Sequence, residues 1–108
     1  MSPVLSMNAL TGEVMVEDIK LARFLRSSRE AAGLTQTEVA EKLGYGSSQF
    51  ISNWERARST PPMNTLRTLA KMYKINMDDL FEHISAASLY YAEQSMRKEY
   101  SLLKKKSR

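Results

Sequence analysis

Apolar residues recur at spacings of three and four along most of this chain, and that period predicts an all-α fold. The first such stretch covers residues 17–32 and ends before Gly33, a residue that readily closes a helix. Its buried stripe consists of Leu21, Ala22, Leu25 and Ala32, with Phe24 beside it. Because Glu17 and Asp18 carry negative charge where a helix N-terminus is positive, we expect the helix to begin there.

Residues 36–56 predict two short helices joined by a glycine-containing turn. Thr35 and Glu38 have the spacing of a capping box, in which each side chain bonds a backbone N–H of the other residue. Val39, Ala40 and Leu43 then share one helical face. Gly44-Tyr45-Gly46 ends this helix, and we expect the next one to start at Ser47 or Ser48 and reach about residue 56.

The second of these helices has two different faces when its positions are projected at 3.6 residues per turn. One face carries Ser47, Phe50, Ile51 and Trp54, and the other carries Ser48, Gln49, Ser52, Asn53 and Arg56. Short uncharged hydrogen-bonding side chains suit base edges, since an amide can bond adenine N6 and N7 together and a hydroxyl lets the helix lie deep in the major groove. The residues predicted to read bases are Ser48, Gln49, Ser52 and Asn53; the alternative is an ordinary solvated surface.

Residues 18–84 resemble the phage-repressor and Cro-type (Xre-like) helix-turn-helix DNA-binding family. The positions that carry the resemblance are Arg29, Gly33-Leu34-Thr35-Gln36, Val39-Ala40, Leu43-Gly44, Ile51-Ser52, Trp54-Glu55-Arg56, Leu66 and Leu69-Ala70. The resemblance implies a five-helix lambda-repressor-like domain, here with a C-terminal helical extension. Two departures are one extra residue in the turn at residues 44–47, and Ala57 where a glycine commonly follows the Glu-Arg pair.

The resemblance also implies roles for particular side chains. Arg29 is expected to form a structural ion pair with Glu55 and so fix the angle of the reading helix. The residues expected to contact DNA phosphates are Gln36, Ser47, Arg56, Arg58, Ser59 and Thr60. The alternative for each of these is a solvated surface position.

Two further helices are expected after Pro61-Pro62. Their core residues are predicted to be Met63, Leu66, Ala70 and Tyr73 in the first, and Leu80, Phe81 and Ile84 in the second, which Asn76 caps. Asp78 and Asp79 fall in that helix's first turn, where acidic residues are favourable, and His83 is the single histidine. We therefore expect no metal, no cofactor, no catalytic residue and no enzymatic activity.

The two ends of the chain differ from this central part. Residues 1–16 show no helical period, so we expect a flexible arm, or else a strand that pairs with a partner subunit. In residues 85–108, Leu89, Met96 and Leu103 lie seven apart, and Tyr100 falls on the same stripe. A long amphipathic helix that dimerises is the leading interpretation; packing back on the domain and disorder are the alternatives.

The composition shows how charge is distributed along the chain and indicates where in the cell we expect the protein. The chain of 108 residues has net charge +4, of which residues 85–108 carry all four charges, because residues 1–17 (−2) and 18–84 (+2) cancel. It has no cysteine and no apolar run near the ~20 residues that span a bilayer. We expect a cytoplasmic protein, nucleoid-associated when bound to DNA, with no membrane contact and no small-molecule substrate.

These observations favour a sequence-specific transcriptional regulator that binds double-stranded DNA as a homodimer on an inverted repeat. Repression, rather than activation, is what the resemblance implies. The alternative is a protein-interaction adaptor or an antitoxin component that has the same fold and uses its tail to bind a protein partner.

Overall fold

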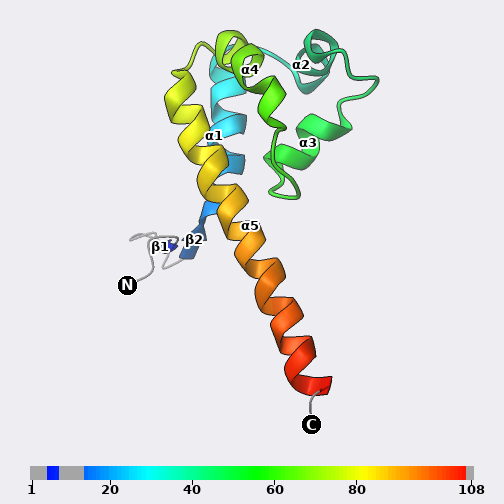
Figure 1. The fold of residues 1–108 in the computed structure, drawn as a ribbon. Helices are drawn as coiled ribbons and strands as arrows, with labels where there is room; N and C mark the ends of the chain where they lie inside the picture. The colour runs from blue at the N-terminus through cyan, green and yellow to red at the C-terminus, as the bar shows by residue number, and fades with distance from the viewer. Residues whose placement is uncertain (1–4, 8–13, 107–108) are drawn as a thin grey trace.

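The computed structural model describes residues 5–7 and 14–106, and within them five α-helices confirm the predicted all-α fold (Figure 1). Their bounds are α1 Glu17–Ala31, α2 Gln36–Leu43, α3 Gln49–Glu55, α4 Leu66–Tyr73 and α5 Met77–Lys106. A short 3-10 helix, η1 Met63–Thr65, precedes α4. None of the described helices has an apolar stretch long enough to cross a membrane.

The N-terminal segment contains regular structure where we expected a flexible arm. Strand β1 (Leu5–Met7) pairs antiparallel with β2 (Val14–Val16), so the two strands pair within one chain. The β-branched valines of β2 favour an extended backbone, and β2 leads directly into α1. The rest of the predicted arm, residues 1–4 and 8–13, lies outside the described residues.

A single hydrophobic core joins all five helices. Its buried residues are Leu21 and Leu25 of α1, Val39 and Ala40 of α2, Ile51 and Trp54 of α3, Leu69, Ala70 and Tyr73 of α4, and Leu80, Ile84 and Ala87 of α5. The first half of α5 lies along α1, and α3 packs against both α1 and α2 (Figure 1). The core therefore holds α3 on one side of the domain with its opposite face outward.

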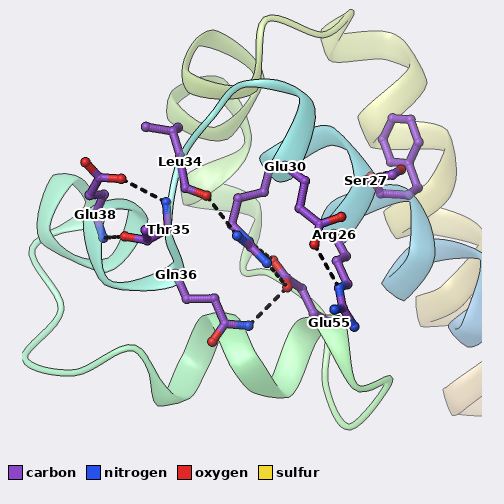
Figure 2. Close-up of polar contacts among 10 residues, drawn as sticks. Arg26, Ser27, Glu30, Leu34, Thr35, Gln36, Glu38 and Glu55 are labelled. Carbon is purple, nitrogen blue, oxygen red and sulfur yellow. Dashed lines mark hydrogen bonds and ion pairs between the residues drawn. The ribbon is translucent and has the colours of Figure 1, made fainter.

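Local sequence signals account for the helix boundaries. The Thr35 hydroxyl accepts the Glu38 N–H at 3.0 Å and the Glu38 carboxylate accepts the Thr35 N–H at 2.8 Å, which confirms the predicted capping box (Figure 2). The side-chain oxygen of Asn76 accepts the N–H groups of Asp78 and Asp79 and so caps α5. Helix α1 ends within one residue of its predicted end.

The four helices α1 to α4 end in the same way. Each is followed by one residue with left-handed backbone conformation: Gly33, Gly44, Ala57 and Lys74. In each case the left-handed residue donates its N–H to a carbonyl three positions back, and the next residue donates its N–H to a carbonyl five positions back, as Tyr45 does to Ala40 at 2.9 Å. These two bonds form the Schellman motif, which satisfies carbonyls at a helix end. At Ala57 and Lys74 it is formed without the glycine that usually occupies that position.

Three apolar residues that we assigned to buried faces are exposed: Phe50, Met63 and Phe81. Phe50 is 55% exposed because it lies at the edge of the buried face of α3, where its ring packs on Tyr45 at 5.0 Å. Met63 falls in the 3-10 turn, in which Thr65 is the buried residue. At the start of α5, Leu80 takes the core position next to Phe81. The expected start of α3 was also too early, since the helix begins at Gln49.

Helix α5 continues without a break through residue 85, where we expected a separate tail to begin. No described residue after Ala87 is buried, and the helix projects away from the other four (Figure 1). Leu89, Met96, Tyr100 and Leu103 are each more than half exposed. The apolar stripe of this segment therefore does not pack back on its own domain.

Candidate nucleic-acid interface

Helix α3 presents a continuous polar face because its apolar residues anchor the opposite side. Ile51 and Trp54 are buried in the core, whereas Gln49 and Arg56 are exposed and Ser52 and Asn53 are half-buried. The Gln49 amide nitrogen donates to the Asn53 side-chain oxygen at 3.0 Å, one helical turn away. This bond leaves the Gln49 oxygen and the Asn53 amide nitrogen able to meet a base edge.

The start of α3 is shaped by two serines. Ser48 is the N-cap residue and its carbonyl accepts the Ser52 N–H at 3.0 Å, while its side chain makes no capping bond. The Ser47 hydroxyl accepts the Gln49 N–H at 3.3 Å. Both hydroxyls therefore lie at the N-terminal end of the helix, Ser47 exposed and Ser48 half-buried.

An ion pair fixes the other end of α3. Arg29 of α1 binds Glu55 through two parallel hydrogen bonds, Nε to Oε2 at 2.7 Å and Nη2 to Oε1 at 3.0 Å. The third guanidinium nitrogen of Arg29, Nη1, donates to the Leu34 carbonyl at 2.8 Å. Only 12% of the Arg29 side chain and 3% of the Glu55 side chain are exposed. The hydrogen bonding of Arg29 to the Glu55 carboxylate, which accepts, raises the pKa of Arg29, so the pair remains charged.

The same carboxylate also binds α2. The Gln36 amide nitrogen donates to Glu55 Oε1 at 3.0 Å. Figure 2 shows the side chain of Gln36 pointing toward Glu55, with Leu34 nearby. Glu55 is the last residue of α3, where the helix dipole disfavours a negative charge, so its three donors offset that cost. Residues of α1, α2 and the turn before α2 thus determine the angle of α3. Gln36, expected to contact phosphate, keeps its second side-chain N–H and its backbone N–H at the start of α2 for such a contact.

Two arginines border the C-terminal end of α3. Arg56 and Arg58 are exposed, and Ser59 and Thr60 beside them are half-buried. Between the arginines, Ala57 adopts φ 59°, and the Arg58 N–H donates to the Asn53 carbonyl at 2.9 Å. With Ser47 at the opposite end of the helix, the predicted phosphate contacts flank the polar face on both sides.

One contact to this loop comes from a residue that the sequence reasoning missed. The hydroxyl of Tyr91, in α5, donates to the Ala57 carbonyl at 2.6 Å. The only feature of the sequence near this contact that could have drawn attention to it was Ala57, at a position where glycine is common. Of the residues expected to dimerise, Leu89 lies just before Tyr91 and Met96, Tyr100 and Leu103 lie beyond it, and all four are more than half exposed.

Comparison with known proteins shows which family has this arrangement of helices. A helix-turn-helix domain family matches residues 20–84, which contain α2, α3 and the ion pair. The chain belongs to the Xre/Cro-type helix-turn-helix family. Within this family, it is 39% identical over 62 residues to the HTH-type transcriptional regulator ImmR of Bacillus subtilis, a match covering 57% of this chain and 48% of ImmR.

Other members of the helix-turn-helix family show the same partial coverage. The chain is 32% identical to the regulator DdrOP3 of Deinococcus deserti over 71% of this chain and 56% of that protein. It is 30% identical to the transcriptional activator BcrR of Enterococcus faecalis over 73% of this chain and 39% of BcrR. The chain therefore spans about half the length of the curated relatives that it matches.

A solved structure has the same fold. The clp gene regulator ClgR from Corynebacterium glutamicum aligns with a TM-score of 0.54 at 23% identity, over 81% of this chain and 95% of that one. At this identity the likeness establishes the architecture alone.

Proposed function

We propose that this protein is a sequence-specific transcriptional regulator that binds double-stranded DNA with α3 in the major groove. The observation that carries the proposal is the outward polar face of α3, on which the Gln49 and Asn53 amides lie one turn apart and bonded to each other. The buried ion pair at the end of α3 supports it, because base readout requires a helix held at a fixed angle. The names of ImmR, DdrOP3 and BcrR support the regulatory role.

Within this proposal the side chains on the polar face of α3 read bases, and those at and beyond the ends of the helix contact phosphates. Gln49 is the first base-reading residue, followed by Asn53, Ser48 and Ser52, and each good amide-to-adenine contact contributes about 1–3 kcal/mol of discrimination. Ser47, Arg56, Arg58, Ser59 and Thr60 fix the register by contacting phosphates. We assign repression, by occupation of promoter DNA, from the family resemblance; the name of BcrR shows that activation also occurs among its relatives.

We further propose that two copies bind together. One reading helix covers only a few base pairs, whereas two copies related by a twofold axis read two half-sites about one helical turn apart. The exposed stripe of Leu89, Met96, Tyr100 and Leu103 on α5 is the surface assigned to this pairing, because a helix of this kind is marginal in water without a partner.

Fluorescence-anisotropy titrations test the proposal. Selection-enriched duplexes and random duplexes would be titrated at three salt concentrations, alongside the mass of the protein in solution. We expect an inverted repeat bound by a dimer, with steep salt dependence and a preference of about 10³-fold or more over random DNA. Weak binding without sequence preference would contradict the proposal.

Replacement of Gln49 tests the assignment of the reading face. Gln49→Ala should lower affinity for the selected duplex by about tenfold or more while leaving binding to random DNA and the melting temperature nearly unchanged. Gln94→Ala is the matched control, because Gln94 is an exposed glutamine in the projecting half of α5. An equal loss on selected and random DNA would exclude Gln49 from base readout.

The second candidate function is an adaptor or antitoxin component that binds a protein through α5. The observation that favours it is the same exposed stripe on the projecting helix, which a protein partner could cover as well as a second copy. A monomeric mass combined with no DNA sequence preference would support this alternative.

A further inference from the structure

The turn that ends α3 contains backbone strain. Ala57 occupies the left-handed position of the Schellman motif at φ 59°, with its N–H bonded to Trp54 and the Arg58 N–H bonded to Asn53. An alanine in this conformation costs about 1 kcal/mol relative to glycine, which has no Cβ to clash with the backbone. A bond from elsewhere in the fold would offset part of that cost.

Tyr91 supplies an additional bond at this turn. Its hydroxyl donates to the carbonyl of Ala57 at 2.6 Å, across 34 positions of sequence. Tyr91 is half-buried, and burial raises the pKa of its hydroxyl, with Asp18 as a smaller cause, so the group stays protonated as a donor. It lies one turn beyond Ala87, the final buried position of described α5.

We propose that Tyr91 is a positioning residue for DNA recognition, which holds the left-handed turn at Ala57 and thereby orients Arg56 and Arg58 on either side of it. This inference rests on the proposed function. The orientation of the Ala57 peptide determines the direction of the backbone at Arg56 and Arg58. Tyr91 binds the carbonyl oxygen of this peptide. Helix α5 thus contributes to phosphate binding without contacting DNA itself.

The alanine at position 57 and the hydroxyl of Tyr91 are linked in this proposal. With glycine at position 57 the turn would need less outside support, and with alanine the hydroxyl of Tyr91 contributes more to holding it. The effect of removing that hydroxyl should therefore depend on which residue occupies position 57. A residue that merely filled space would show no such dependence.

Four full-length proteins test the inference: the parent, Tyr91→Phe, Ala57→Gly and the double variant. Amide hydrogen exchange of Arg58, measured by NMR without DNA, reports the turn directly, because this N–H closes the Schellman motif. We expect Tyr91→Phe to speed this exchange and to weaken DNA binding, each by about fivefold, the usual effect of one hydrogen bond. In the Ala57→Gly background the same substitution should change both quantities less than twofold.

The control is Tyr90→Phe, since Tyr90 is the half-buried neighbour of Tyr91 and contacts it ring to ring at 6.0 Å. It should leave Arg58 exchange and DNA affinity unchanged. Unaltered Arg58 exchange in Tyr91→Phe, or an equal effect in the glycine background, would overturn the inference. Faster exchange with undiminished DNA affinity would overturn the positioning role alone, whereas a parent protein without DNA sequence preference would overturn the proposed function.

Discussion

The two halves of α5 contain similar apolar residues, but only the first half is covered by protein. Leu80, Ile84 and Ala87 are buried at spacings of four and three, whereas Leu89, Met96 and Leu103 follow them on the opposite side of the helix, in exposed positions. The period of apolar residues is thus enough to specify an amphipathic helix, and it does not specify what covers the apolar face. Because most helical stability in proteins comes from such packing, the second half of α5 depends most on a partner.

The ion pairs of the two regions differ in the same way. Arg29 and Glu55 are nearly buried and bonded at two points, with a third bond to the Leu34 carbonyl. Arg97 and Glu93 form a pair one turn apart on the projecting half of α5, and both side chains are exposed to solvent. Water screens the exposed pair and offers each group other partners, so the two pairs should differ greatly in their effect on stability.

The largest expected effect comes from one leucine in each half of the same helix. Leu80→Ala should lower the free energy of unfolding by about 2–5 kcal/mol, since it leaves a cavity in the core. Leu103→Ala, at a position 65% exposed, should cost less than about 0.5 kcal/mol at protein concentrations where the chain is monomeric. Urea unfolding followed by circular dichroism gives both values. Equal losses at low concentration would show that the projecting half is covered within one chain.

The ion pairs provide the next comparison. Arg29→Ala should cost about 3 kcal/mol, because it leaves Glu55 buried with Gln36 as its remaining side-chain donor, and it should weaken DNA binding at the same time. Arg97→Ala is the matched control and should cost less than about 0.5 kcal/mol. Thermal melting and DNA titration of each variant would measure the two effects. Unchanged stability in Arg29→Ala would contradict a structural role for the pair.

The smallest expected effect is a decrease in the free energy of unfolding at alkaline pH, caused by a tyrosine in the hydrophobic core. Burial raises the pKa of Tyr73, so the folded protein holds this proton more tightly than the unfolded chain does. Its contribution is fully present below the unfolded pKa of about 10 and is lost as pH rises beyond it. Between about pH 9 and about pH 10.5 the loss should approach 1 kcal/mol.

Tyr73→Phe should remove that part of the pH dependence. The matched control is Tyr100→Phe, in the exposed half of α5, which should leave the dependence of the parent protein intact. Urea unfolding at a series of pH values would separate the two. An identical slope in the parent and in Tyr73→Phe would mean that the Tyr73 hydroxyl reaches solvent.

The sequence-based predictions succeeded where a feature depends on residues within about one helical turn. The capping box at Thr35, the cap at Asn76 and the glycine stops at Gly33 and Gly44 are all present. The errors concern apolar residues whose burial depends on distant neighbours: Phe50, Met63 and Phe81 follow the helical period and are nevertheless exposed. The pairing of β1 with β2 was missed because two strands of three residues leave little pattern to detect.

The candidate site shows the same division. The polar face of α3 follows from the sequence alone, since Ile51 and Trp54 fix which side is buried. The contact between Arg29 and Glu55 was expected only through a family resemblance, and the Gln36 bond to the same carboxylate was not expected at all. The bond from Tyr91 to Ala57 had no sequence signal beyond the alanine itself.

By itself the sequence determined the five helices, their caps and the polar face that α3 turns outward, because capping bonds and helical periodicity involve residues at most four or five positions apart. The tertiary structure decided which apolar residues are covered, how Glu55 is held and which distant hydroxyl supports the turn after α3. Those contacts join residues 19 to 34 positions apart. They exist only once the helices have packed, and no local preference of the chain encodes them.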